Sequence, residues 1–341
     1  MKNKIFRIIQ TIVLIGLGVF FIFFFWGKLD ADQQTKVVEN FKKANYFWMF
    51  LALIAGILSH ILRAARWNLL ISTIEKPPSV KNSFWSLMAG YLANLAVPRL
   101  GEITRAMLLS RRSKISFDKL FGTVVAERAF DFFFFILLFF VAIAAFWHNI
   151  EVFVTNRILG GLDEKIKLLS NGSIWIITTS FIILFCFVFW LLKKYKNKPF
   201  IAKINRFIHN LISGLMSIFK LKNAFLFLSY TLLIWLLYWL MVYLMYFSIP
   251  STSNLSVESA FIVLVFGTIG IIVIQGGIGI YPLIVSEVLL IYGADITDGF
   301  TIGWLSWSVQ TIMIIIMGLI AFTLFGFKKN NKDEFHKINQ Q

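Results

Sequence analysis

Three charged residues, Arg99, Glu102 and Arg105, follow a proline turn and are the residues best suited to chemistry in this chain. Their spacing of three and six residues keeps them within one flank of a short helix, where Glu102 can pair with both arginines. A helix that begins between Pro98 and Gly101 also presents free backbone N–H groups and the positive end of its dipole. Arginines beside a helix N-terminus predict an anion-binding site.

A second charged group lies on the next predicted helix, where Glu127 and Asp131 are four residues apart and share a face. Arg128 is three residues from Asp131, within reach of an ion pair. One interpretation is a charge network that locks this helix to the preceding segment. The other is that the same carboxylates hold arginines in place for a ligand, and both can be true.

His60, Arg63 and Arg66 lie toward the end of an earlier apolar segment. Snorkelling of the long side chains to the headgroups at the membrane surface is one explanation for the two arginines. The alternative is that they line the other wall of the same anion-binding cavity. His60 alone is more typical of a hydrogen-bonded packing residue than of a ligand.

Gly276, Gly277 and Gly279 form a glycine-rich turn in the second half of the chain, which permits positive φ or close backbone approach. Three polar residues stand near it in apolar sequence: Gln275, Glu287 and Gln310. An isolated acid such as Glu287 is either paired for structural reasons or acts on a proton or substrate. The glutamines are suited to hydrogen bonding between helices.

The composition is that of a membrane protein. Of 341 residues, 58% are hydrophobic and only 15% are charged, which excludes a soluble domain with a polar surface. The net charge of +16 comes from Lys and Arg in short loops between apolar spans, so we expect contact with anionic lipid and none with nucleic acid. The single cysteine, Cys186, and the lack of known catalytic motifs predict no metal, no cofactor and no enzymatic activity.

Six long apolar spans are predicted, at about 8–26, 46–71, 119–147, 172–192, 222–249 and 300–326. Two further apolar segments, 83–112 and 258–292, are interrupted at Pro98 and Gln275, and each is expected to form two short helices that meet at a turn. The first span follows a basic flank and lacks a cleavage site, so we expect it to remain uncleaved. Residues 199–219 have an amphipathic helical period, which predicts a connector helix on the inner membrane surface.

The distribution of basic residues sets the expected orientation. Residues 193–222 contain many Lys and Arg and no acid, whereas 250–258 contain neither Lys nor Arg. Because cytoplasmic loops carry the excess of basic residues, both termini are expected in the cytoplasm. The halves 46–147 and 222–326 then share one order of elements with inverted topology, which points to a transporter site near the membrane midplane. The prediction is one all-α membrane domain over 1–341.

The motifs around these residues resemble those of a known family. They are RAARW at 63–67, NLAVPRLGEITR at 94–105, AERAFD at 126–131 and GGIG at 276–279. Together they resemble the lysylphosphatidylglycerol synthase transmembrane domain family, also called flippase-like or UPF0104 proteins, from about residue 7 to 327. The resemblance implies an integral membrane domain of the kind that, in full synthases, moves an aminoacylated phospholipid across the bacterial membrane.

The resemblance also implies roles for the residues that match the motifs: Asn94, Pro98, Arg99, Gly101, Glu102, Arg105, Glu127, Arg128 and Asp131. Gln275 and Pro282 depart from the family pattern, which has proline and glutamate at these positions, and Glu287 is a candidate replacement for the acid. The chain ends at Gln341 without the soluble aminoacyl-transferase domain of full synthases, so we expect no synthesis of lysyl-lipid.

These observations lead to one leading hypothesis and two alternatives. The leading hypothesis is a translocator of an anionic or amphiphilic lipid in a bacterial inner membrane, with the headgroup captured from the cytoplasmic leaflet in a central cavity. The expected cavity residues are Arg99, Arg105, Glu102, Asn94, Arg63 and Arg66. The first alternative is an ion- or proton-coupled carrier of a small solute that uses Glu287. The second is a membrane-embedded enzyme that acts on a lipid-linked substrate through Glu102 or Glu127.

Overall fold

The computed structural model describes residues 30–145 and 223–326, a few positions between 16 and 29, and Leu221. The predicted span at 172–192 and the connector helix at 199–219 lie outside the described residues, as does most of the span at 8–26. The chain divides into two compact units, residues 1–124 with 223–341 and residues 125–222. The second unit is described only over 125–145 and at Leu221.

All secondary structure in the described ranges is helical. The elements are α2 (Ala31–Lys43), α3 (Tyr46–Ile71), α4 (Val80–Ala96), α5 (Leu100–Arg112), α6 (Phe117–Ala145), α11 (Ala224–Tyr246), η3 (Pro250–Thr252), α12 (Val257–Val273), η4 (Gln275–Gly277), α13 (Ile280–Ile291) and α14 (Ile296–Gly326). Helices α3, α6, α11 and α14 are each long and apolar enough to cross a membrane. Four of the predicted spans are therefore confirmed as helices of spanning length.

The two interrupted segments form helical hairpins, as predicted. Helices α4 and α5 pack together across a turn at Val97–Arg99, and α12 and α13 pack together across a turn that contains η4. These four helices contain 17, 13, 17 and 12 residues. Because a helix needs about 20 residues to cross the hydrocarbon core, each hairpin is too short for two full crossings.

The backbones of the two hairpins match at a constant offset of 177 residues. The hydroxyl groups of Ser79 and Ser256 cap α4 and α12 by accepting the N–H three residues on. Arg99 and Gly276 both adopt the left-handed conformation, with φ and ψ of 61° and 8° in the first turn and 67° and 5° in the second. Each is followed by an N–H that donates to the carbonyl three residues back, at 3.2 Å and 2.8 Å. The two turns therefore match up to the left-handed residue and then diverge, because α5 begins directly after Arg99 whereas Gly277 and Gly279 also have positive φ before α13 begins.

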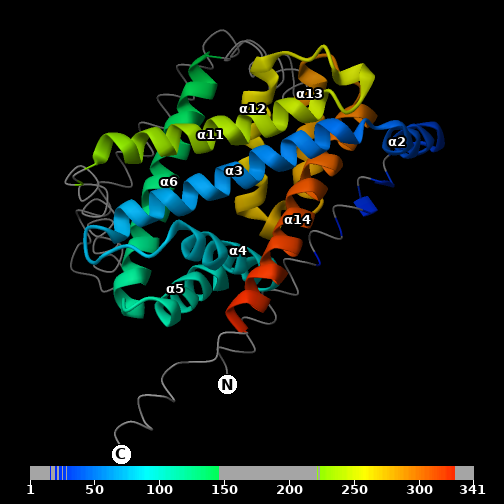
Figure 1. The fold of residues 1–341 in the computed structure, drawn as a ribbon. Helices are drawn as coiled ribbons and strands as arrows, with labels where there is room; N and C mark the ends of the chain where they lie inside the picture. Colours follow the sequence, from blue (N-terminus) through cyan, green and yellow to red (C-terminus); the bar gives the residue numbers. More distant parts are fainter. Residues whose placement is uncertain are drawn as a thin grey trace, which may run out of the picture. The chain divides into compact units, whose positions relative to one another are not determined.

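Helices α3 and α11 lie side by side and run in opposite directions (Figure 1). The N–H of Asn45, just before α3, donates to the carbonyl of Ser248, just after α11, at 2.8 Å. Toward the other ends of the two helices, Arg66 Nη1 donates to Thr231 Oγ1 at 3.0 Å. Antiparallel packing of the leading helices is what an inverted arrangement of the two halves requires.

Helix α14 packs against both hairpins. Gly318 of α14 lies so close to α4 that an added Cβ would be 2.5 Å from Leu92 Cβ. Gly303 is equally close to α13, with Pro282 Cα at 2.5 Å from the position of its Cβ. The hairpin ends also meet, because Leu95 Cδ2 is 3.5 Å from the Cβ position of Gly276. Small residues thus bring the two interrupted segments together.

Helix α2 is an element that the sequence analysis did not predict. Asp30 accepts the N–H of Gln33 at 2.8 Å, and Gln33 accepts the N–H of Asp30 at 3.1 Å, which is a capping box. Val37 of α2 packs in a core cluster with Phe300 of α14. The aspartate and the glutamine three residues later were the signal in the sequence.

An ion pair fastens α2 to the start of α14. Lys36 Nζ lies 2.9 Å from Asp295 Oδ2, and Asn40 donates to the buried Asp298 at 2.7 Å. Partial burial opposes both charges, but the hydrogen bond to Asp295 and the nearby carboxylates outweigh it and raise the pKa of Lys36. The same bond and the N–H of Thr297 lower the pKa of Asp295 despite its partial burial.

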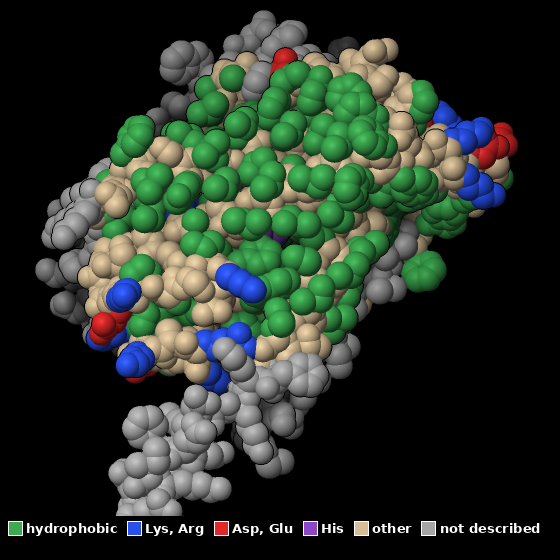
Figure 2. Space-filling view, in the orientation of Figure 1, with side chains coloured by type: hydrophobic (Ala, Val, Ile, Leu, Met, Phe, Trp, Pro, Cys, Tyr) green, Lys and Arg blue, Asp and Glu red, His purple; other side chains and the backbone are tan. Residues whose placement is uncertain are grey.

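The outer face over α3, α11 and α14 is mostly hydrophobic, with charged side chains gathered toward its two ends (Figure 2). Along α3 the exposed apolar side chains include Phe50, Leu58 and Ile61, at 57%, 47% and 40% exposure. Their spacing places them on one side of the helix, away from the buried polar residues described below. An apolar belt between charged ends is the surface expected in contact with lipid.

Candidate functional site

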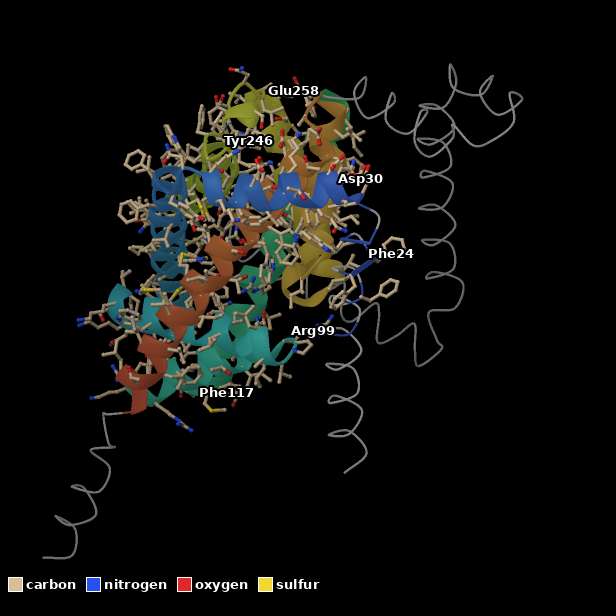
Figure 3. All side chains as sticks on the ribbon, turned by 90° about the vertical axis from the view of Figure 1, so that its right-hand side faces the viewer. Phe24, Asp30, Arg99, Phe117, Tyr246 and Glu258 are labelled. Carbon is tan, nitrogen blue, oxygen red and sulfur yellow. The ribbon has the colours of Figure 1, made fainter. Side chains whose placement is uncertain are left out.

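Arg99 lies in the turn of the first hairpin and is held in an unfavourable backbone conformation. It is the N-cap residue of α5 with φ of 61°, the one positive φ at a non-glycine residue in the described part of the chain. For a residue with a side chain this conformation costs roughly 1–2 kcal/mol. The side chain of Arg99 is exposed at the edge of the described helices (Figure 3). Backbone strain of this kind is concentrated at functional sites.

Asn94 and two glycines hold the first hairpin closed. The side-chain oxygen of Asn94 accepts the N–H of Gly101 at 2.6 Å. A Cβ at Gly101 would be 2.6 Å from Asn94 Cγ, and a Cβ at Gly90 would be 2.8 Å from Gly101 O. The N–H of Leu100 is also used, by the carbonyl of Val97. Two of the first N–H groups of α5, which the sequence predicted to be free, therefore already have acceptors within the hairpin.

Arg105 is buried in the interior, with 1% of its surface exposed. Its guanidinium carbon lies 4.8 Å from the centre of the Trp67 ring, a cation–π contact. Trp67 in turn donates its indole N–H to Thr123 Oγ1 at 2.9 Å. The prediction that Arg99 and Arg105 share one flank of a helix is wrong, because Arg99 precedes α5 and is exposed whereas Arg105 points into the core.

Arg63 and Arg66 are also inside the bundle, at 7% and 0% exposure. Arg63 Nη1 donates to the Tyr91 hydroxyl at 2.8 Å. Arg66 donates to Thr231, as described above, and lies 5.3 Å from the centre of the Phe227 ring. Snorkelling to the membrane surface is therefore wrong for both side chains. We call Arg63, Arg66 and Arg105 the interior arginines.

His60 sits next to the interior arginines on α3. Its ring centre is 4.9 Å from that of Tyr91 in α4 and 6.4 Å from that of Tyr238 in α11. With 8% exposure it is a buried packing residue, as the sequence analysis expected. Tyr91 was missed, although an aromatic hydroxyl within an apolar helix is a signal that it needs a polar partner.

The two acids of α6, Glu127 and Asp131, belong to the second unit. Glu127 has 0% and Asp131 has 9% of its surface exposed, and Arg128 between them is half-buried. The interval of four residues places both acids on one face of α6. Glu102 of α5, in the first unit, is half-buried. Carboxylates and arginines are thus both removed from water, which in proteins requires pairing or hydrogen bonding.

The turn of the second hairpin matches the first up to the left-handed residue and carries no charged side chain. Gly276, Gly277 and Gly279 have φ of 67°, 71° and 73°, as predicted from the glycine run. Trp307 of α14 donates its indole N–H to the carbonyl of Gly276 at 2.7 Å, a contact that the sequence analysis missed. The side chain of Gln275 lies outside the described part of the structure. Glycine here allows the left-handed conformation at no steric cost.

Two further residues predicted for the site, Glu287 and Gln310, lie on helices of the second half. Glu287 is half-buried on α13, and Gln310 is half-buried on α14, where it lines a small cavity. Among the described residues, no group of three His, Cys, Asp or Glu side chains is placed to hold a metal ion.

The fold and this arrangement define a membrane protein with several apolar helices and two interrupted helical hairpins. The sequence matches the family described as the lysylphosphatidylglycerol synthase TM region over residues 7–318, and the chain belongs to that family. This confirms the resemblance derived from the motifs.

Two relatives are UPF0104 membrane proteins. The one from Methanocaldococcus jannaschii is 30% identical over 128 residues, which are 37% of this chain and 37% of the relative. The one from Methanothermobacter thermautotrophicus is 26% identical over 106 residues, 30% of this chain and 31% of the relative. The matched segments thus span about a third of each relative. No solved structure matches the chain.

Proposed function

We propose that this protein translocates an anionic or amphiphilic lipid across a bacterial inner membrane. In this proposal the headgroup first meets Arg99 and then enters the bundle beside the interior arginines. The whole chain, 1–341, acts as one domain of two inverted halves, about 46–147 and 222–326, with both termini in the cytoplasm. Family membership, the antiparallel pairing of α3 with α11 and the matched hairpin turns support the arrangement.

The observation that carries the proposal is the strained, exposed arginine in the first turn. The equivalent residue of the second turn is Gly276, which adopts the same conformation without strain. A glycine at position 99 would stabilise the fold, so the arginine has a reason other than stability. A guanidinium is suited to a phosphate headgroup, because its planar donors bind two oxygens at once.

The interior arginines extend this cationic region into the bundle. Arg63 links α3 to the first hairpin through Tyr91, so a ligand that draws Arg63 away would also loosen the hairpin. Glu102 is proposed to hold an arginine when no lipid is bound and to compete for it when the lipid leaves. Such competition keeps buried cations paired at every stage, which avoids the large cost of an isolated buried charge.

The exposure of the hairpin ends favours a lipid over a small solute. Leu100, next to Arg99, is 37% exposed, and Ile272 and Val273 at the end of α12 are 62% and 65% exposed. A solute carrier needs a site sealed from the membrane, whereas a lipid path needs an apolar opening beside its headgroup site. Arg99 with exposed apolar neighbours fits the second requirement.

The test is transport of fluorescent lipids in proteoliposomes, with anionic and zwitterionic lipids compared. We expect Arg99→Gln and Arg63→Gln to slow transfer of the anionic lipid at least tenfold, because each removes a charge from the proposed path. Lys119→Gln is the matched control, since Lys119 is a half-exposed surface residue paired with Glu75 at 2.8 Å. It should leave transport unchanged.

Two results would contradict the proposal. One is transfer of the anionic lipid at the wild-type rate by folded, inserted Arg99→Gln protein. The other is a chemically altered lipid, detected by mass spectrometry after incubation with the purified protein, which would favour an enzyme. Thermal unfolding of each variant in detergent separates loss of function from loss of fold.

A further inference from the structure

Three polar side chains from two helices line a small cavity among α3, α11, α13 and α14. Tyr281 of α13 and Ser306 of α14 are hydrogen-bonded to each other, and Gln310 follows Ser306 by one turn on the same face of α14. The other lining side chains are apolar and belong to α3, α11 and α14. The polar groups are therefore concentrated on the side where the second hairpin packs against α14.

The cavity has room for one water molecule. The space open to the centre of a water-sized sphere is about 10 Å³, and one bound water needs about 10–15 Å³ on this scale. A ligand with two or more non-hydrogen atoms is thus too large. A monatomic cation would fit by size, but no carboxylate lines the cavity, and a charge among apolar side chains without a counter-charge is costly. Size and chemistry together favour a neutral water.

The polar lining groups retain hydrogen-bonding capacity that a water can use. The bond between Tyr281 and Ser306 uses one of their two O–H donors and leaves lone pairs on both oxygens. Gln310 is half-buried, and in the described part of the chain its amide has no hydrogen-bond partner. A buried water typically makes about three hydrogen bonds to such groups, whereas an apolar cavity stays dry. The three side chains together meet that requirement.

We propose that Tyr281, Ser306 and Gln310 bind one water molecule that joins α13 to α14. The water connects the two hydroxyl groups with the Gln310 amide and so supplies that amide with a partner in apolar surroundings. Trp307, next to Ser306, donates to the carbonyl of Gly276, so the water adds to the contacts through which α14 holds the second hairpin. The inference is independent of the proposed function, because it concerns the anchoring of the second hairpin and not the ligand of the first.

A high-resolution density map of the full protein tests the site directly. We expect one compact peak within about 2.7–3.2 Å of the Gln310 amide and of at least one of the two hydroxyl oxygens. A map that resolves Tyr281, Ser306 and Gln310 without such a peak overturns the inference.

Thermal unfolding of the full protein in detergent tests the water independently. Val309→Ile adds one carbon atom, close to a water in size, to a residue that lines the cavity. If a water is bound there, its displacement leaves the Gln310 amide without a partner, and we expect the unfolding temperature to fall by about 2 °C or more. If the cavity is dry, the added carbon fills it and the unfolding temperature rises. Such a rise overturns the inference.

A second background separates loss of the water from overpacking. Gln310→Met replaces the amide by an apolar side chain of similar length, so Val309→Ile should lower the unfolding temperature by about half as much or less in that background. Val263→Ile adds the same carbon to a buried residue of α12 outside the cavity lining, and it should have equal effects in both backgrounds. An equal loss for Val309→Ile in both backgrounds would assign the effect to strain and overturn the inference.

Discussion

The two hairpins share their backbone up to the left-handed residue of each turn and differ in chemistry. Both begin at a serine cap, both first helices contain 17 residues, and Arg99 and Gly276 occupy equivalent left-handed positions. The first turn uses Arg99 and is followed by Glu102 and Arg105, whereas the second uses Gly276 and is followed by a helix without Lys or Arg, in which Glu287 is the one charged residue. The backbone up to the turn is thus shared, and the arginines are added to one copy of it.

The two turns differ in whether the left-handed residue favours stability. At the second turn, glycine gives the lowest-energy solution and Trp307 fixes its carbonyl. At the first turn, an arginine occupies the equivalent position at an energetic cost. Under the proposed function, the first hairpin is adapted to a ligand and the second to close packing.

The largest expected effect on stability comes from a substitution at Gly101, where close contacts hold the first hairpin together. In Gly101→Ala the new Cβ would meet the backbone oxygen of Gly90 and lie 2.6 Å from Asn94 Cγ, so the hairpin must open. We expect a loss of about 3 kcal/mol or more in unfolding free energy. A close-packed glycine of the second hairpin, Gly267, gives the comparison: in Gly267→Ala the new Cβ meets the Tyr281 ring at 2.7 Å, which can tilt, and the change should cost about 1–2 kcal/mol.

Denaturant titration in detergent measures this difference, with Gly122→Ala as the control that meets no neighbour. Equal losses at Gly101 and Gly267 would mean that the two hairpins do not differ in packing as described.

The next effect tests the left-handed residue in each turn. Gly276→Ala places a side chain in the unfavourable conformation and should cost about 1–2 kcal/mol, because the new Cβ meets only Leu95, at an ordinary 3.5 Å. Arg99→Ala should change stability by less than about 0.5 kcal/mol, since the same strain is already present. Thermal unfolding of both variants checks the asymmetry. A large loss for Arg99→Ala would show that the arginine side chain stabilises the fold.

A smaller effect is expected from the hydrogen bond that fixes the second turn. Trp307→Phe removes the donor to Gly276 and retains an aromatic ring beside Trp304. We expect a loss of about 0.5–1.5 kcal/mol and faster amide exchange in the turn. Hydrogen exchange followed by mass spectrometry reports the turn directly. Unchanged amide exchange at residues 274–279 would show that Trp307 does not stabilise the turn.

The smallest effect concerns the ion pair between α2 and α14. The pKa of Asp295 is lowered, so its contribution is present above the ordinary value of 3.8 and is lost as pH falls through the folded pKa. The pKa of Lys36 is raised, so its contribution is present below 10.5 and is lost as pH rises through the folded pKa. Both side chains are nearly half-exposed, which limits the contribution to about 1 kcal/mol or less.

Unfolding temperatures of wild type and Lys36→Met should therefore differ slightly between about pH 4 and 10 and converge outside that window. A constant difference down to pH 2 would assign the effect to packing of α2.

The sequence predicted the helical elements better than the contacts within the site. Apolar length located α3, α6, α11 and α14, and Pro98 and the Gly276 run located both turns because backbone chemistry at proline and glycine is local. Helix α2 was missed because it is short and polar, and its capping box was the only signal for it in the sequence.

For the site, the directions of the side chains could not be predicted from the sequence. A spacing of six residues suggested that Arg99 and Arg105 face one ligand, but that holds only if both lie within the helix, and Arg99 precedes it. The burial of Arg66 and the partners Tyr91 and Thr231 come from other helices, and no local pattern encodes such contacts. The family resemblance, by contrast, rested on motifs and was confirmed over residues 7–318.

The central claim is that Arg99 serves the ligand at the expense of the fold, and Arg99→Gly tests it directly. Unfolding free energy and transfer of anionic lipid in proteoliposomes are measured on the same preparation. Our account predicts a gain in stability of up to about 1 kcal/mol, because glycine removes about 1–2 kcal/mol of strain and loses about 0.5–1 kcal/mol of conformational entropy on folding. It also predicts at least a tenfold loss of transport. Wild-type transport by a more stable Arg99→Gly protein would contradict the account.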